Sequence, residues 1–523
     1  MSGVQAPFST ARSPRHMVAS ADQLATQAGL AVLALGGNAV DAAIATNAAI
    51  AVTGPHLCGM GGDLFALVHV AGEVHCLNAS GRAGSGADAG AMRRDGLRSM
   101  PFRHDIRTVT VPGCVDGWQA LHERFGSMPL ATVLAPAIAL AEHGFPASPL
   151  LVGSLARVDD EARRALHVLA EQARRPGNRV VRSGVGAALR GIAEGGRDAF
   201  YLGAFGHGLR SAGAGWYSDA DLSRPGADWV TPLRRSAWGV DLWTVPPNSQ
   251  GYLTLGAAML AESTGLPADP GSEHWAHVLV EAAKSAGHDR PDALHAGADG
   301  DALLDSIATR DVATTAASTL GVRTRSGDTT YLCTVDGNGM GVSLIQSNAS
   351  GFGSWLVEPS TGINLHNRGL GFTLDEGHPA ELAPGARPPH TLSPALATRG
   401  TELASVFGTM GGDAQPQILL QLAARLFAHG ESPAVAVHAP RWVLDGESTG
   451  FDTWTSETGP QVLLEGHCPT DWDAALTARG HRVRRIAPYD SAFGHAQCIV
   501  RDAEGFWAGA ADPRARVASA AGA

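Results

Sequence analysis

The segment with the clearest chemical potential is Gly327-Asp328-Thr329-Thr330, which precedes an alternating, strand-like run. A threonine hydroxyl is a weak nucleophile unless a base lies beside it. If the peptide bond before Thr329 is cut, the freed α-amine can serve as that base, because its intrinsic pKa is about 7.7–8.0. Such an enzyme needs its threonine at the head of a strand, after an exposed loop, and the pattern predicts both for Thr329. Taken alone, the segment is still better interpreted as an ordinary strand start, since Thr-Thr is common before strands.

Three other sequence patterns resemble functional motifs but lack the context that those motifs require. Gly446 to Gly450 matches the G-x-S-x-G turn of serine hydrolases, but a strand-like run follows it instead of the required helix. Gly337-x-Gly339-x-Gly341 lies within an expected hairpin and not before a helix, which disfavours a dinucleotide-binding loop. His274 and His277 could share one face of a helix, but no further ligand set accompanies them in the sequence. We therefore predict no metal site.

Length, composition and charge exclude several classes of function. The chain has 523 residues, 44% of them hydrophobic and 17% charged, so it can bury a large core and is not disordered as a whole. A net charge of -11 argues against nucleic-acid and membrane-surface partners. The six cysteines include no C-x-x-C pair, so neither a zinc knuckle nor a disulfide framework is predicted. Lys284 is the only lysine, which we interpret as compositional bias.

Two observations make the cytoplasm the expected compartment. Residues 1–16 contain no apolar core of the kind found in signal peptides. The most apolar stretch, residues 39–53, is interrupted by Asp41 and Asn47 and is too short to span a bilayer.

The elements that must position Thr329 change in character along the chain. Apolar residues at helical spacing predict helices mainly in the first half, at about 23–35, 38–53, 115–200 and 273–287. Residues 292–327 are rich in Ala, Asp and Ser without periodicity, so we expect a surface linker there. Beyond it, alternation predicts a β-hairpin that places Tyr331, Cys333 and Val335 on one face and turns at Gly337-Asn338-Gly339. The pattern predicts a helical first half and a sheet-rich second half.

Blocks of sequence along the chain resemble those of the γ-glutamyltransferase (glutathione hydrolase) family of N-terminal-nucleophile hydrolases, from about residue 17 to residue 516. The blocks of the first half are ATQAGLAVLALGGNAVDAAIA, GPHLCGMGGD, NASGRAG, VTVPGCVDGW, VPPNSQG and EHWAHVLVEAAK. Those of the second half are GDTTYLCTVD, SLIQSNASGFGS, GINLHNRG, PPHTLSP, GTMGGDAQPQ, FGHAQCIV and GAADPR. The resemblance implies an α+β fold, a four-layer αββα sandwich of the N-terminal-nucleophile hydrolase type.

The resemblance also implies that one precursor cuts itself between Asp328 and Thr329. The products would be a helix-rich large subunit of residues 1–328 and a catalytic, sheet-rich small subunit of residues 329–523, which stay together as one sandwich. Thr329 would be both the self-processing group and the nucleophile, and Ser347 stands where the family usually has a threonine that hydrogen-bonds the nucleophile. Gly411 and Gly412 match the pair whose amides form the oxyanion hole.

The positions that match the family's substrate-binding residues are only partly kept. Arg82 matches the arginine that binds the α-carboxylate of a γ-glutamyl group, which a guanidinium holds through two hydrogen bonds. His390 and Thr391 stand where many members have two serines that touch the same carboxylate. Asn348 could replace an asparagine that the family has one position later, at Ala349.

Two departures concern the charge of the pocket. The acidic residue that binds the substrate's α-ammonium in γ-glutamyl-specific members is replaced by Gly371, and Arg368 adds a positive charge close to it. Both changes should weaken recognition of an ammonium group. The segment between Phe372 and Pro388 is also short, so a long lid over the site is expected to be missing, which favours hydrolysis over transpeptidation.

The predicted function is that of a γ-glutamyltransferase-family amidohydrolase. It would form an acyl-enzyme from a γ-glutamyl amide such as glutathione and pass the acyl group to water or an amine, without a metal or an organic cofactor. Two alternatives stay open. One is the same mechanism on another carboxylate-bearing amide, of oxamate-like or glutaryl type. The other is an unprocessed, inactive homologue that binds a small acid. Association of the paired subunits into larger oligomers is also left open.

Overall fold

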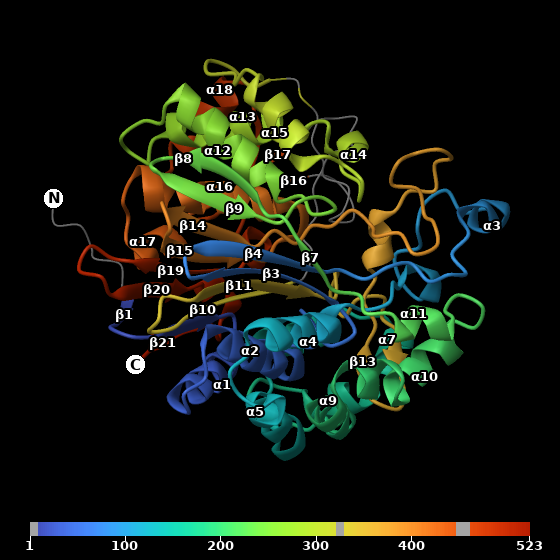
Figure 1. Ribbon diagram of the computed structural model, residues 1–523. Helices are drawn as coiled ribbons and strands as arrows, with labels where there is room; N and C mark the ends of the chain where they lie inside the picture. Colours follow the sequence, from blue (N-terminus) through green and yellow to red (C-terminus); the bar gives the residue numbers. More distant parts are fainter. Residues whose placement is uncertain (1–8, 319, 321–328, 446–460) are drawn as a thin grey trace.

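Two seven-stranded antiparallel sheets are stacked face to face at the centre of the protein (Figure 1). The computed structural model describes residues 9–318, 320, 329–445 and 461–523. The strands of sheet A are, in spatial order, β1 (Ala11–Ser13), β20 (Trp507–Ala511), β19 (Ala496–Arg501), β15 (Glu402–Thr409), β14 (Ala395–Arg399), β9 (Val240–Thr244) and β8 (Leu233–Ala237). Those of sheet B are β21 (Ser519–Gly522), β2 (Met17–Ser20), β10 (Thr330–Val335), β11 (Gly341–Ser347), β3 (Asp63–Val70), β4 (Glu73–Ala79) and β7 (Asp228–Val230).

The central apolar layer lies between the two sheets. On β10, Tyr331, Cys333 and Val335 point into it, while Leu332 belongs to the core on the opposite face of sheet B. This is the alternation predicted for the hairpin, and it follows from the period of two in a strand. In sheet A, Val406 and Ile499 complete the layer from the other side.

Helices cover the outer face of each sheet, at the top and the bottom of Figure 1. On the side of sheet B, the helices that contact its strands are α1 (Gln23–Ala34), α2 (Ala39–Thr53) and α4 (Cys114–Phe125), while α5 (Leu130–His143) packs on α2 and α9 (Ser183–Tyr201) packs on α5. On the side of sheet A, the helices that contact its strands include α12 (Tyr252–Thr264) and α16 (Gln415–Ala423), while α13 (Glu273–Gly287) and α15 (Gly300–Ala308) pack on α12 and α18 (Trp472–Ala478) packs on α13. The αββα sandwich implied by the family resemblance is therefore confirmed.

Shorter elements connect or extend these layers. The helices are α3 (Ala89–Arg94), α6 (Pro149–Leu155), α7 (Asp160–Ala165), α8 (His167–Gln172), α10 (Ala204–Ala212), α11 (Asp219–Ser223), α14 (Arg290–Ala293) and α17 (Pro433–His438). The strands are β5 (Phe145–Pro146), β6 (Arg179–Val180), β12 (Val357–Glu358), β13 (Ile363–Asn364), β16 (Trp442–Asp445), β17 (Gln461–Leu464) and β18 (Arg482–Arg485). Among the described helices, none is both long and apolar enough to cross a membrane.

The structure corrects one expectation about how the chain is organised. Helix α15 lies within the stretch expected to be a surface linker, because Asp299 caps its first amides and Leu304 and Ile307 are buried against α12. The parts of the chain before and after residue 328 share one layered fold. Sheet B joins β2, β3 and β4 from before residue 328 to β10, β11 and β21 from after it.

Candidate active site

The hairpin formed by β10 and β11 places Thr329 opposite Ser347. Thr330 pairs with Gln346 in the antiparallel register, so the residue before β10 faces the last residue of β11. The hydroxyl of Thr329 donates a hydrogen bond to Ser347 Oγ over 3.0 Å. Both residues are buried, with Thr329 only 1% exposed. Ser347 Oγ also accepts the Ala349 amide over 2.7 Å, which fixes its position.

A buried carboxylate that the sequence analysis missed lies on the next strand. Asp63 begins β3 and is the register partner of Ser347. Its Oδ1 accepts the Gly81 amide over 2.8 Å, and its Oδ2 lies 3.0 Å from His390 Nε2. Although burial alone would raise the pKa of Asp63, the neighbouring His366, His390 and Arg368 lower it to about 2. Asp63 is therefore ionised at neutral pH.

His390 is held as a neutral donor to this carboxylate. The Leu392 amide donates to its Nδ1 over 3.2 Å, so the proton of the ring is assigned to Nε2, which faces Asp63. Burial, reinforced by the charge of Arg368, lowers the pKa of His390 to about 3. The histidine at this position thus orients Asp63 without adding a charge of its own.

Arg368 places a positive charge beside the predicted nucleophile. It starts a short 3₁₀ turn, Arg368–Gly371, and is 1% exposed. Its Nη1 donates to Thr391 Oγ1 over 3.0 Å, and its Nη2 lies 3.5 Å from Ser347 Oγ. Burial lowers the pKa of Arg368 to about 10 against the opposing charges of Asp63 and Asp413, so it stays protonated at neutral pH.

Gly411 and Gly412 follow β15 in a conformation that suits glycine. Their φ angles are 142° and 56°, which side chains disfavour. In the described part of the chain, neither amide donates a hydrogen bond to a protein acceptor. Gln250, another residue that the sequence analysis missed, donates from Nε2 to the carbonyls of Thr391 and Gly412, each over 3.0 Å. It therefore ties the glycine turn to the Arg368 side of the site.

The two sheets approach closely at this end of the sandwich. A Cβ atom added at Gly408 of β15 would lie 2.2 Å from the ring of Tyr331 on β10. Because Tyr331 is two residues after Thr329 and Gly408 is three before Gly411, the glycine turn and Thr329 belong to the same end of the stacked sheets.

Two predicted substrate-binding residues have other partners. Arg82 donates from Nη2 to Asp228 Oδ2 over 2.7 Å and from Nη1 to the Gly385 carbonyl over 3.3 Å. Asp228 is shared with the buried Arg387, again at 2.7 Å. Asn348 donates its side-chain amide to the Pro55 carbonyl over 3.3 Å, so it faces the loop after α2. Among the described hydrogen bonds, none joins either side chain to Thr329.

A side chain at the position of the missing acid would meet the backbone of a neighbouring segment. A Cβ atom added at Gly371 would lie 2.2 Å from the carbonyl oxygen of Pro389 and 3.1 Å from the side chain of Pro388. The replacement at Gly371 therefore comes with a close backbone contact and not with empty space. Asp328, on the other side of the predicted cut, and the Gly446–Gly450 pattern lie outside the described residues.

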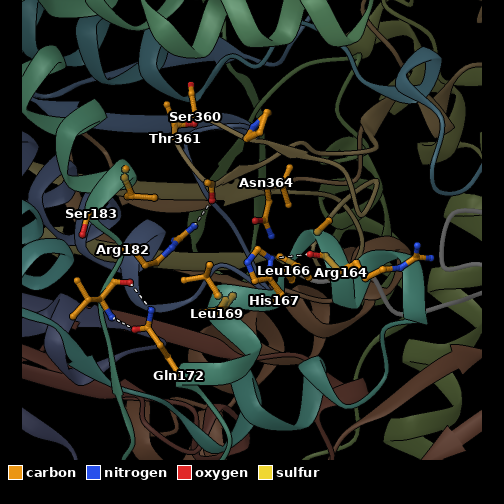
Figure 2. A pocket seen from close by; sticks show the side chains of 18 residues that line it. Arg164, Leu166, His167, Leu169, Gln172, Arg182, Ser183, Ser360, Thr361 and Asn364 are labelled. Carbon is orange, nitrogen blue, oxygen red and sulfur yellow. Dashed lines mark hydrogen bonds between the residues drawn. The ribbon is translucent and has the colours of Figure 1, made fainter.

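A separate cavity of about 620 Å³ opens between the α7–β6 region and the segment around β12 and β13 (Figure 2). Its lining includes Arg182, His167, Thr361 and Asn364, but not Thr329. Arg182 donates to the carbonyls of Ala51 and Val52 at the end of α2 and to that of Gly362. Its charge thus caps a helix C-terminus, a structural use of a half-buried arginine.

The family model described as gamma-glutamyltranspeptidase matches residues 25–522. The chain belongs to the gamma-glutamyltranspeptidase family. It is 34% identical to the glutathione hydrolase-like YwrD proenzyme of Bacillus subtilis (strain 168), over 96% of this chain and 97% of that one. It is 35% identical to the oxamate amidohydrolase proenzyme of Klebsiella pneumoniae, over 97% and 98% of the two chains.

A solved structure agrees with this family assignment. The cephalosporin acylase from Bacillus halodurans superposes with a TM-score of 0.88 and 33% identity, covering 100% of this chain and 98% of the acylase. The family predicted from the sequence blocks is thus confirmed. The gamma-glutamyltranspeptidase relatives carry different substrates in their names, so membership fixes the fold and the class of enzyme more closely than the substrate.

Proposed function

We propose that this protein is a threonine amidohydrolase that activates itself and then hydrolyses a small carboxylate-bearing amide. The observation that carries the proposal is the buried hydrogen bond between Thr329 and Ser347 at the head of β10. Because the Thr329 hydroxyl donates this hydrogen bond to Ser347 Oγ, the lone pairs of Thr329 Oγ1 can point toward a carbonyl carbon.

Self-activation needs no group from outside the chain except water. Thr329 Oγ1 attacks the Asp328 carbonyl carbon, the C–N bond breaks, and the Thr329 nitrogen takes a proton to become an amine. Water then hydrolyses the resulting ester, which releases the Asp328 carboxylate and restores the Thr329 hydroxyl. The strands of sheet B from both sides of the cut support the proposal that the two fragments stay together.

In turnover the freed amine takes the Thr329 proton as Oγ1 attacks the substrate amide. The amides of Gly411 and Gly412 are the proposed donors to the oxyanion, a role supported by their lack of acceptors among the described residues. One such donor is worth about 3 kcal/mol in a serine hydrolase. The amine or ammonia leaves with the proton, and water discharges the acyl-enzyme.

The position of Arg368 favours an acyl group whose carboxylate lies close to the scissile carbonyl. Its Nη2 is 3.5 Å from Ser347 Oγ, which in turn is 3.0 Å from the attacking oxygen. A short acid of the oxamate type fits that spacing. The turn Arg368–Gly371 also contains no acidic residue that could bind an α-ammonium group. Its last residue, Gly371, lies against the Pro389 carbonyl. A γ-glutamyl amide such as glutathione is the second candidate, favoured by the similarity to the glutathione hydrolase-like relative.

Denaturing gels and a substrate panel test the proposal. The wild-type chain should yield fragments of 328 and 195 residues, and Thr329→Ala should yield only the intact chain with no turnover, whereas Thr329→Ser keeps a hydroxyl. Oxamate, glutaryl-p-nitroanilide and γ-glutamyl-p-nitroanilide then separate the substrate classes. A tenfold preference for the γ-glutamyl donor over its glutaryl analogue, about 1.4 kcal/mol, would show that the α-ammonium group is recognised. Failure to release ammonia from oxamate would reject the short-acid proposal.

We propose a reducing compartment, the cytoplasm, as the place of action. All six cysteines are free and buried, which supports a chain that matures without disulfides. Fractionation of the native host with an antibody against the chain tests this location.

A further inference from the structure

The only lysine of the chain is part of a buried ion pair. Lys284, near the end of α13, is 3% exposed, and its Nζ lies 2.8 Å from Oε1 of Glu281, one turn earlier on the same helix. Removing two charges from water is costly, so a pair of this kind persists when further hydrogen bonds satisfy its remaining atoms. Lys284 therefore has a defined place in the fold.

The pair holds both backbone groups of one residue. The Ser318 amide donates to Glu281 Oε2 over 3.0 Å, and Lys284 Nζ donates to the Ser318 carbonyl over 3.2 Å. Ser318 belongs to the stretch just upstream of the proposed cut, and the residues 319–328 separate it from Thr329. The ion pair thus fixes the chain on the upstream side of the processing site.

The same stretch is also tied to the proposed small subunit. The Ala317 amide donates to the Arg479 carbonyl over 2.7 Å, and Arg479 Nη1 donates to the Thr314 carbonyl over 3.2 Å. Arg479 follows α18, so these bonds join the end of the proposed large subunit to the other fragment. Together with the Lys284–Glu281 pair they form a tether, which we define as the bonds made to residues 314–318.

A metal site is the competing interpretation of this region. Ligand atoms of the buried His277, Glu281 and His481 lie within 4.8 Å of one another. However, His277 Nδ1 and His481 Nε2 already share a hydrogen bond of 2.8 Å. The two oxygens of Glu281 are occupied by Lys284 and by the Ser318 amide. An ammonium group 2.8 Å from a ligand oxygen would repel a cation, so the contacts favour a hydrogen-bonded anchor.

We propose that Lys284 and Glu281 are positioning residues for self-cleavage, because they fix Ser318 and limit the freedom of the chain that leads to Thr329. The inference rests on the proposed cut before Thr329. Bringing two ends of a chain together costs more entropy as the chain between them lengthens. Loss of the Ser318 contacts would leave the bond between the Ala317 amide and the Arg479 carbonyl as the nearest described anchor upstream of the cut, so we expect slower cleavage and not its complete loss.

A matched pair of variants at Ser318 tests the anchor. Ser318→Pro removes the amide proton that Glu281 accepts, while Ser318→Ala removes a hydroxyl that makes no hydrogen bond among the described residues. The full chain is made by cell-free translation, and the appearance of the two fragments is followed on denaturing gels. We expect Ser318→Pro to cleave at least threefold more slowly than Ser318→Ala. Equal rates for the two variants would overturn the proposal.

A second readout follows the anchor without cleavage. Because Lys284 is the only lysine, its acetylation by an activated acetate ester can be measured by mass spectrometry of one peptide in the uncleaved Thr329→Ala chain. Acetylation should be at least threefold faster with Ser318→Pro than with Ser318→Ala, and equal labelling would reject the anchor. If the wild-type chain fails to cleave at all, the proposed function is wrong while this result still reports on the anchor.

Variants of Lys284 and Glu281 provide an independent test in case the Ser318→Pro variant misfolds. Lys284→Met with Glu281→Met replaces the ion pair by apolar side chains of similar volume, a change that often leaves stability intact. It should slow cleavage as Ser318→Pro does. Arg425→Met with Glu431→Met removes a partly buried ion pair that does not touch residues 314–318 and should cleave at the wild-type rate. One equivalent of bound metal in the wild-type protein, lost in His481→Ala, would overturn the anchor in favour of a metal site.

Discussion

Two buried arginines, Arg368 and Arg514, differ in the groups to which they donate hydrogen bonds. Arg514 donates to Glu465 and Asp512, at distances of 2.5–3.0 Å, and to the carbonyls of Val437 and Ala439. Although burial lowers the pKa of Arg514, the two carboxylates raise it above the usual value. The described hydrogen bonds of Arg368 go to the hydroxyls of Thr391 and Ser347, and its pKa is lowered to about 10.

The difference separates a charge used for folding from a charge placed for chemistry. Around Arg514 direct contacts with carboxylates offset the loss of hydration, and the cluster joins β17, β20 and α17. Around Arg368 the loss of hydration is offset less fully, since burial lowers its pKa to about 10. Its Nη2 lies 3.5 Å from Ser347 Oγ, the atom to which the Thr329 hydroxyl donates. Perturbed groups of the second kind are typical of functional sites.

The largest expected effect is on the stability of the Arg514 cluster. Arg514→Met leaves Glu465 and Asp512 buried with fewer cationic partners, so we expect a loss of about 3–5 kcal/mol in the free energy of unfolding. Urea denaturation followed by circular dichroism measures it. The double variant Arg514→Met, Glu465→Met removes the stranded carboxylate and should recover a large part of the loss. A change below about 1 kcal/mol in the single variant would contradict the assignment of this cluster to folding.

Arg368→Met should reduce activity strongly and stability less, the reverse of the effect expected for Arg514→Met. We expect kcat/KM on a carboxylate-bearing amide to fall about 100- to 1000-fold, or about 2.7–4 kcal/mol, since the substrate carboxylate loses its charged partner. The free energy of unfolding should fall less than in Arg514→Met, because Asp63, which loses a cationic neighbour, keeps its hydrogen bonds with the Gly81 amide and with His390. Arg368→Lys keeps the charge but not the planar fork and should recover only part of the activity. Destabilisation as large as that of Arg514→Met would erase the distinction.

The parts of the site that the sequence predicted are those set by local pattern. Alternation and the Gly337-Asn338-Gly339 turn predict the hairpin, and the hairpin register alone brings Thr329 to Ser347. The extra charge of Arg368 near the pocket was also expected from its place beside Gly371. Family blocks carried the rest of the prediction, including the layered fold.

The parts that were missed depend on contacts between distant segments. Asp63 reaches the site because β3 pairs with β11, and the final Asp of GPHLCGMGGD before a strand was the only signal for it. Asp228 as the partner of Arg82 comes from β7 at the edge of the same sheet. Helix α15 was missed because its alanines and aspartates resemble a polar linker until Leu304 and Ile307 are seen against α12.

Gly371→Ala tests how closely the backbone around Arg368 is packed. The added methyl would lie 2.2 Å from the Pro389 carbonyl, so the turn that carries Arg368 has to shift. Overpacking of this kind costs about 1–3 kcal/mol, which we expect to see in the urea midpoint together with a several-fold rise in KM. Gly153→Ala, at an open glycine that likewise has no positive φ, serves as the matched control for adding a methyl group. An unchanged KM in Gly371→Ala would show that Arg368 does not depend on this packing.

The smallest effect concerns a property that the two clusters share, a buried neutral histidine. Burial lowers the pKa of His390 beside Asp63 to about 3 and that of His495 beside the Arg514 cluster to about 4. Unfolded histidines titrate near 6.5, so the stability contributed by each neutral ring is complete above that pH and is lost as the pH falls toward the folded pKa. For each of these two histidines, the free energy of unfolding should fall by about 1.4 kcal/mol for every pH unit below 6.5. His390→Asn and His495→Asn should each reduce the slope of unfolding free energy against pH by about one proton between pH 6 and pH 4.5. A wild-type stability that stays flat over this range would mean that neither ring is held neutral.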